Sequence, residues 1–263
     1  MTRVTHRYGL IGYPLGHSFS GRYFARKFER EGLPHCAYEL FPLPDIAQLP
    51  ALLEAHPDLR GLNVTIPHKE AVLRFAEAGE EAVRQLGAAN TIVVLPERLL
   101  AFNTDVYGFE QSLMRWLAEA GVGDVRALQA LVLGTGGAAK AVAFVLRKLG
   151  IGYRMVSRSP QKGDLTYAQL TPVLLARHRL VVNTTPVGMA PHTDALPPVP
   201  VEAFGESHLV YDLVYNPERT RLLQEAEKRG ARVKNGLEML YLQAERSWAI
   251  WERFHPVRRA PAK

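Results

Sequence analysis

One segment of the chain reads Leu128-Gln129-Ala130-Leu131-Val132-Leu133-Gly134-Thr135-Gly136-Gly137-Ala138. Its first half is a nearly continuous apolar run, typical of a strand buried in a parallel sheet. Residues 139–149 follow with helical spacing, so the glycines stand between a strand and a helix. Glycines at that junction let the backbone approach a pyrophosphate, and the N–H groups of the helix N-terminus bind it. The stretch therefore predicts a Rossmann-type dinucleotide site at Gly134 to Ala138, with a glycine turn that binds no ligand as the alternative.

The residues after the next expected strand, 152–156, indicate which dinucleotide binds. Sites for NAD place an acidic side chain at the end of that strand, where it accepts from the ribose hydroxyls. This chain has Ser157 and Arg158 there, with Lys162 just beyond, and Asp164 lies too far along. Because an arginine can donate two parallel hydrogen bonds to a 2′-phosphate, we expect NADP(H) as the cofactor.

Strands and helices alternate on both sides of this stretch, which predicts an α/β fold with parallel strands. In the N-terminal part we expect strands at 8–12, 37–41 and 59–66, helices at 19–31, 46–56 and 69–78, and a hairpin of 91–95 with 99–102. Further strands at 180–183 and 208–212 indicate a doubly wound, Rossmann-type sheet. A helix at 237–254 is expected to return to the first domain. We predict a substrate-binding and catalytic domain of residues 1–102 and 237–263, and an NADP-binding domain of residues 103–236.

Composition narrows the class of protein. The chain has 263 residues, enough for two modest domains, and 32 basic against 26 acidic residues give a net charge of +6. The basic residues are scattered, which argues against nucleic-acid binding and suits small anionic ligands. Cys36 is the only cysteine, so no intrachain disulfide can form. With no apolar stretch of roughly 20 residues and no signal-peptide core, we expect a cytoplasmic protein with no membrane partner and no metal, either a monomer or a homodimer.

Short polar side chains gather where the N-terminal strands are expected to end. Singly, each could be a helix cap or a turn residue. Because side chains alternate along a strand, Asn63 and Thr65 point to one face, and Lys69 is expected at the start of the following helix. Together the set suits a polyhydroxylated small molecule, and it comprises Ser18, Ser20, Asn63, Thr65, Lys69, Asn90 and Asp105.

At these residues the chain resembles the shikimate dehydrogenase family. The similar motifs run in order through nearly the whole chain and are Gly12-Tyr13-Pro14-Leu15-Gly16-His17-Ser18-Phe19-Ser20, Asn63-Val64-Thr65-Ile66-Pro67-His68-Lys69, Asn103-Thr104-Asp105, Asn183-Thr184-Thr185-Pro186-Val187-Gly188-Met189, Tyr211-Asp212-Leu213-Val214-Tyr215-Asn216-Pro217 and Gly236-Leu237-Glu238-Met239-Leu240-Tyr241-Leu242-Gln243-Ala244. The resemblance implies the NADPH-dependent, reversible reduction of 3-dehydroshikimate to shikimate, a step of aromatic amino-acid biosynthesis.

The resemblance also implies roles for individual residues. Lys69 and Asp105 would be the catalytic pair, with the lysine donating a proton to the reduced carbonyl oxygen. The substrate would be held by Ser18, Ser20, Asn63, Thr65, Asn90, Asp105, Tyr215 and Gln243. The cofactor would be lined by Gly134, Thr135, Gly136, Gly137, Ala138, Ser157, Arg158, Lys162, Leu213 and Gly236.

Three other functions remain open from the sequence. A quinate/shikimate dehydrogenase using NAD would need the acidic residue that the second strand lacks. A non-catalytic NADP-binding regulator would have no need of an intact Lys69 and Asp105. An enzyme like methylene-tetrahydrofolate dehydrogenase would need larger apolar walls beside the polar cluster.

Overall fold

The computed structural model describes residues 4–16 and 19–259 of the chain. These residues form two compact units, the first comprising residues 1–104 and 244–263 and the second residues 105–243. Helices stand at both changeovers: α4 (Thr104–Glu119) begins at the first, and α8 (Leu237–Phe254) runs through the second. Residues 237–243, the N-terminal part of α8, thus belong to the second unit, and residues 244–254, its C-terminal part, belong to the first.

The first unit contains a six-stranded sheet in the order β2-β1-β3-β5-β6-β4. Strands β1 (His6–Gly12), β2 (Cys36–Pro42) and β3 (Leu59–Val64) are parallel. The expected hairpin forms from β5 (Thr91–Val94) and β6 (Leu99–Phe102), and β5 is antiparallel to both β3 and β6. The parallel sheet expected for this part is therefore wrong: the sheet is mixed, because a short hairpin connection can join only antiparallel strands.

The expected helix at 69–78 is also wrong. Lys69 lies in a turn, and only the short 3₁₀ helix η2 (Ala71–Arg74) follows before strand β4 (Glu77–Ala78), which pairs with β6. The apolar side chains of this segment pack into the core beside β3 and β5. They do so without forming the α-helix that their spacing predicted. The other helices of the unit are α1 (Phe19–Arg30), η1 (Ile46–Gln48), α2 (Leu49–Ala55) and α3 (Glu81–Leu86), of which the sequence did not indicate α3.

An aromatic core joins α1 and α8 to one face of this sheet. Tyr8 stacks on Trp251 with ring centroids 4.9 Å apart, and Phe24 and Trp248 pack around them. The indole N–H of Trp251 donates to the carbonyl of Ile92 on β5 (2.9 Å). A Cβ on Gly61 would lie 2.2 Å from the same indole nitrogen, so a glycine on β3 is what lets α8 pack this closely.

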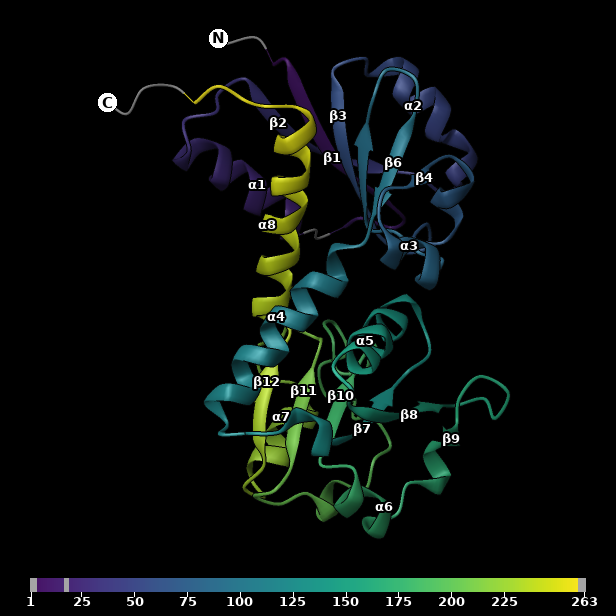
Figure 1. The fold of residues 1–263 in the computed structure, drawn as a ribbon, viewed down its shortest axis with the longest axis vertical. Helices are drawn as coiled ribbons and strands as arrows, with labels where there is room; N and C mark the ends of the chain where they lie inside the picture. The colour runs from purple at the N-terminus through teal and green to yellow at the C-terminus, as the bar shows by residue number, and fades with distance from the viewer. Residues whose placement is uncertain (1–3, 17–18, 260–263) are drawn as a thin grey trace. The chain divides into compact units, whose positions relative to one another are not determined.

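The second unit is a doubly wound domain in which all six strands are parallel, in the order β12-β11-β10-β7-β8-β9. With β7 as the first strand of the unit, this is the Rossmann order. The strands, labelled in Figure 1, are β7 (Gln129–Leu133), β8 (Gly152–Ser157), β9 (Leu165–Thr166), β10 (Leu180–Asn183), β11 (Leu209–Asp212) and β12 (Arg232–Asn235). Beyond α4 and α8 the helices are η3 (Val125–Ala127), α5 (Gly137–Lys148), η4 (Tyr167–Gln169), α6 (Pro172–Arg177), η5 (Val201–Ala203) and α7 (Arg221–Glu227).

The sequence-based expectation for this unit is confirmed in β7, α5, β8, β10 and β11, and misses β9, α6, α7 and β12. Within the described residues, 4–16 and 19–259, no helix combines the length and hydropathy that a membrane span needs.

Candidate functional site

The glycine loop of the second unit is built as an anion site. Gly134 has a φ of +109°, a conformation that side chains rarely adopt, and a Cβ there would lie 2.7 Å from the hydroxyl of Thr184. Its N–H donates to the carbonyl of Val156 on β8 (2.8 Å). At Gly136, the N-cap of α5, a Cβ would meet open space. The first N–H groups of α5 thus adjoin an open volume, which fits a dinucleotide pyrophosphate.

The predicted 2′-phosphate contacts lie at the end of β8. Ser157 is its last residue, Arg158 follows and is exposed, and Lys162 is exposed in the next turn. The first acidic residue after the strand in the sequence is Asp164. Its carboxylate accepts a hydrogen bond from the backbone N–H of Met155 (2.7 Å), two residues before the strand ends. Because that carboxylate is bound to the strand backbone, the end of β8 presents cations to a ribose, which fits NADP(H) better than NAD.

The loops after β11 and β12 meet at two other predicted cofactor residues. A Cβ on Gly236 would lie 2.0 Å from the carbonyl oxygen of Leu213, so the backbones are in direct contact. The N–H of Gly236 donates to the carbonyl of Val214 (3.2 Å). Tyr215, a predicted substrate residue, is half-buried in the same loop after β11.

A buried polar network underlies the predicted substrate residues of the first unit. The amide of Asn63 donates to the hydroxyl of Ser247 on α8 (3.0 Å) and to that of Thr91 (3.3 Å). The carbonyl oxygen of the Asn90 side chain accepts from the backbone of Thr104 (2.7 Å). The hydroxyls of Thr104 and Ser247 lie 3.1 Å apart. The predicted residues Asn63 and Asn90 are therefore brought together in one network, with fixed side-chain orientations.

Tyr38 extends this network to α1. Its hydroxyl donates to the side-chain oxygen of Asn63 (2.8 Å) and is also hydrogen-bonded to Ser20. Burial raises the pKa of Tyr38 well above its usual value, against the Ser20 hydrogen bond, which lowers it. The phenol therefore stays neutral and links Ser20 to Asn63.

Lys69 lies in the turn after β3, close in sequence to Thr65. Its backbone carbonyl accepts from the N–H of Ala89 (2.8 Å), which places the turn beside the residue that precedes Asn90. The N–H of Thr65 donates to the carbonyl of Ile11 at the end of β1 (2.9 Å). The segment that carries the predicted catalytic lysine is thereby hydrogen-bonded to the end of β1 and to the turn that precedes β5.

The remaining predicted residues are placed as follows. Ser18 lies outside the described residues. Asp105 is buried in the first turn of α4, and the side chain of Gln243 donates to the carbonyl of Leu240 within α8 (3.0 Å). Lys69 belongs to the first unit and Asp105 to the second, so their catalytic pairing stays a prediction.

Comparison with known proteins identifies the family. The profile of the shikimate dehydrogenase substrate binding domain matches residues 10–92, which lie in the first unit. The shikimate dehydrogenase (NADP(+)) of Symbiobacterium thermophilum is 39% identical, over 92% of this chain and 87% of that protein. The chain belongs to the shikimate dehydrogenase family.

Solved structures of shikimate dehydrogenases share the whole fold. The Thermus thermophilus enzyme, crystallised with NADP(H) and shikimate, is 35% identical with a TM-score of 0.80, over 94% of this chain and 93% of that one. The Listeria monocytogenes enzyme, crystallised with shikimate and NAD, is 28% identical with a TM-score of 0.80, over 99% of this chain and 96% of that one. Both nicotinamide cofactors thus occur in structures of this family, which makes the residues after β8 the informative ones.

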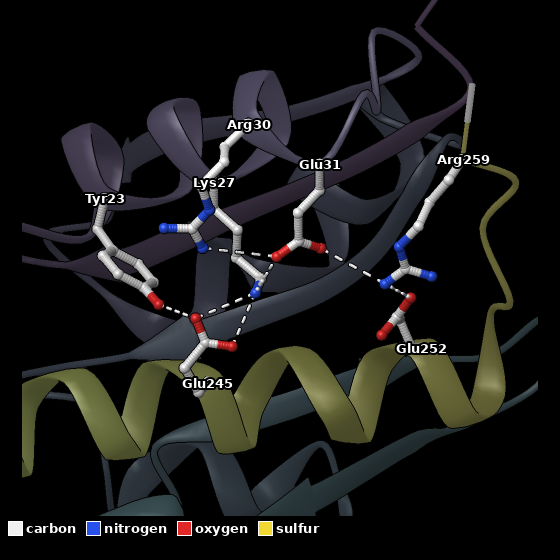
Figure 2. A network of polar contacts seen from close by, with 7 residues as sticks. All are labelled: Tyr23, Lys27, Arg30, Glu31, Glu245, Glu252 and Arg259. Atoms are coloured by element: carbon white, nitrogen blue, oxygen red, sulfur yellow. Dashed lines mark hydrogen bonds and ion pairs between the residues drawn. The ribbon is translucent and has the colours of Figure 1, made fainter. Parts of the chain in front are cut away.

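Sequence reasoning missed an ionic network that supports α1, the helix that carries Ser20 (Figure 2). The ammonium of the buried Lys27 lies 2.7 Å from Glu31 and 2.7 Å from Glu245 of α8. Tyr23 also donates to Glu245. Burial opposes ionisation of Glu31, but Lys27 and Arg259 outweigh it and lower its pKa. Glu31 therefore stays ionised, and the network fixes α1 on the C-terminal half of α8.

Sequence reasoning also missed Tyr38 and Ser247. Ser247 stands on the apolar face of α8, four residues before Trp251. A polar residue in an otherwise apolar helical stripe is a signal that could have indicated a buried hydrogen bond.

Proposed function

We propose that this member of the shikimate dehydrogenase family catalyses the reversible, NADPH-dependent reduction of 3-dehydroshikimate to shikimate in aromatic amino-acid biosynthesis. The observation that carries the proposal is the pairing, in one chain, of a Rossmann loop followed by Arg158 with the buried polar network at Asn63 and Asn90. The first suits a phosphorylated dinucleotide. The second holds hydroxyl and amide groups of the kind that bind a polyhydroxylated acid.

The residues of the chain divide the chemical work. Bound NADPH supplies a hydride to the ketone carbon. The ammonium of Lys69 stabilises the negative charge that develops on the ketone oxygen and then donates the proton that completes the alcohol. Asp105 orients the lysine and a neighbouring substrate hydroxyl. In the reverse direction Lys69 takes the proton back as the alcohol is oxidised.

The other predicted residues hold the two reactants. Substrate hydroxyls and the carboxylate are bound by Ser18, Ser20, Asn63, Thr65, Asn90, Tyr215 and Gln243. The loop of Gly134, Thr135, Gly136, Gly137 and Ala138 would hold the pyrophosphate, and Ser157, Arg158 and Lys162 would hold the 2′-phosphate. Leu213 and Gly236 would also line the cofactor. We also propose that the protein acts in the cytoplasm as a monomer or homodimer. We propose further that it binds no nucleic acid, since its positive charge is scattered along the chain.

The proposal is tested by following NADP⁺ reduction with shikimate, using purified wild-type protein and Lys69→Ala. We expect turnover by the wild type and a loss of roughly 10²–10⁴-fold in the variant, as for removal of an acid/base group. Lys228→Ala is the matched control, because Lys228 is an exposed lysine at the C-terminal end of α7, where it pairs with Glu225. A wild type that reduces no NADP⁺ with shikimate would rule the function out, and near-normal turnover of Lys69→Ala would rule out the proton-transfer role.

A further inference from the structure

A buried carboxylate stands at the point where β11 ends. Asp212 is fully buried, and each of its oxygens accepts hydrogen bonds. One oxygen accepts from the side-chain amide of Asn183 at the end of β10 (2.9 Å) and from the N–H of Val214 (3.0 Å). The other accepts from the hydroxyl of Thr220 (2.6 Å). A single carboxylate thus connects two neighbouring strands and the loop between β11 and α7.

The cluster reaches three loops at the same edge of the sheet. The side-chain oxygen of Asn183 accepts from the N–H (3.1 Å) and the hydroxyl (2.7 Å) of Thr185, which fixes the loop after β10. The Val214 bond fixes the loop after β11, between the predicted cofactor residue Leu213 and the predicted substrate residue Tyr215. The third loop joins through Gly236, whose N–H donates to the carbonyl of Val214.

We propose that Asp212 is a positioning residue: its ionised carboxylate holds the loops after β10, β11 and β12 in the conformation that binds the nicotinamide cofactor. This inference rests on the proposed function for its ligand. Asp212 is fully buried, so it acts through the backbone of residues 213–215 and through Asn183.

The hydrogen-bond pattern suits the charged form, because all three contacts donate to the carboxylate. Asn183 from β10, and Val214 and Thr220 from the segment after β11, face the carboxylate, and none of them titrates near neutral pH. The two N–H groups bound to one oxygen can only donate, so a proton fits only on the oxygen that faces Thr220, where it would reverse the direction of the Thr220 hydrogen bond. Burial raises the pKa of Asp212 to about 6, and the three hydrogen bonds oppose that rise. The carboxylate is therefore ionised at pH 8 and mostly protonated at pH 5.

The test measures NADP⁺ affinity by calorimetry for the wild type and Asp212→Asn, from pH 5 to pH 8. Asparagine keeps the shape of the side chain and removes the charge. We expect Asp212→Asn to bind NADP⁺ about 10-fold more weakly at pH 8, the equivalent of one charge-assisted hydrogen bond. At pH 5 the two proteins should bind alike. Titration of the 2′-phosphate of NADP⁺ affects both proteins equally and cancels in the ratio.

Two threonines provide matched controls. Thr220 and Thr171 each cap a helix, α7 and α6, by accepting from the N–H three residues on, but of the two only Thr220 also donates to Asp212. We expect Thr220→Val to weaken NADP⁺ binding at pH 8, and Thr220→Ser, which keeps the hydroxyl, to restore it. Thr171→Val should lose only the stability of its cap and bind NADP⁺ like the wild type.

A purely structural role predicts a different pattern. Asp212→Asn, Thr220→Val and Thr171→Val would then have lower melting temperatures with unaltered NADP⁺ affinity, or the ratio of NADP⁺ affinities between the wild type and Asp212→Asn would not vary with pH. Either result would overturn the inference. Amide hydrogen exchange at residues 184, 185, 187 and 213–215 is a readout without cofactor, and should be faster in Asp212→Asn than in the wild type at pH 8. Failure of the proposed function is separable, because it shows as wild-type protein that binds NADP⁺ and does not oxidise shikimate.

Discussion

The contact between Gly61 on β3 and Trp251 on α8 gives a sharp prediction for Gly61→Ala. The added methyl carbon would lie 2.2 Å from the indole nitrogen and 2.4 Å from the adjacent ring carbon, far inside normal contact distance. Trp251 is fully buried and its ring is rigid, so either the helix or the strand must move. Overpacking of this kind costs about 1–3 kcal/mol.

A displaced indole would also lose its hydrogen bond to the carbonyl of Ile92 (2.9 Å). That bond contributes about 1 kcal/mol, so Gly61→Ala should lower the free energy of unfolding by about 2–4 kcal/mol in total. The corresponding fall in melting temperature is roughly 4–16 °C. Urea unfolding followed by tryptophan fluorescence measures it, because Trp248 and Trp251 both lie in the first unit.

Gly21→Ala is the matched control for this measurement. Gly21 lies within α1, and a Cβ there would be 3.7 Å from its nearest neighbour, so alanine fits and should stabilise the helix by about 0.5–1 kcal/mol. In a Trp251→Ala background, Gly61→Ala should cost less than in the wild type, because the ring that the new methyl group strikes is gone. An unchanged urea midpoint for Gly61→Ala, or an equal cost in both backgrounds, would refute this packing argument.

Three further changes have defined outcomes. Arg158→Ala should reduce the preference for NADP⁺ over NAD⁺ in kcat/KM by about 10- to 100-fold, since it removes charged hydrogen bonds to the 2′-phosphate; an unchanged preference would refute that role. Lys27→Met should lower the free energy of unfolding by about 1–3 kcal/mol, because Glu31 and Glu245 lose their shared cation; urea unfolding measures this, and an unchanged midpoint would contradict it. For Asp212, the folded pKa of about 6 exceeds the ordinary value of 3.8, so its contribution to stability is greatest below pH 4 and is lost as the pH rises through 6. That loss is about 3 kcal/mol, and it should disappear from pH-dependent urea unfolding of Asp212→Asn.

The parts of the fold that sequence predicted well are those with local signals. The apolar run ending at Leu133, the glycines after it and the helical spacing beyond them specify β7, the loop and α5 without reference to distant residues. The long amphipathic pattern of residues 237–254 gave the bounds of α8. The hairpin of β5 and β6 was likewise visible in its short turn.

The parts it missed depend on partners far along the chain. Residues 69–78 form no α-helix because β4 pairs with β6, and that pairing outweighs a local pattern compatible with a helix. Tyr38 and Ser247 reach Asn63 across 25 and 184 positions of sequence, so their roles appear only once the sheet and α8 are assembled. Among the predicted site residues, Asn63, Asn90 and Ser20 lie in one network, whereas the mutual placement of Lys69 and Asp105 remains a prediction.

We expect this chain to oxidise shikimate with NADP⁺, using Arg158 to select the cofactor and Lys69 to move the proton. The most direct measurement is kcat/KM for the purified wild type with shikimate and with quinate, each with NADP⁺ and with NAD⁺. We predict that shikimate with NADP⁺ gives the highest value of the four. A higher value for quinate or for NAD⁺, or no activity with any pair, would contradict it.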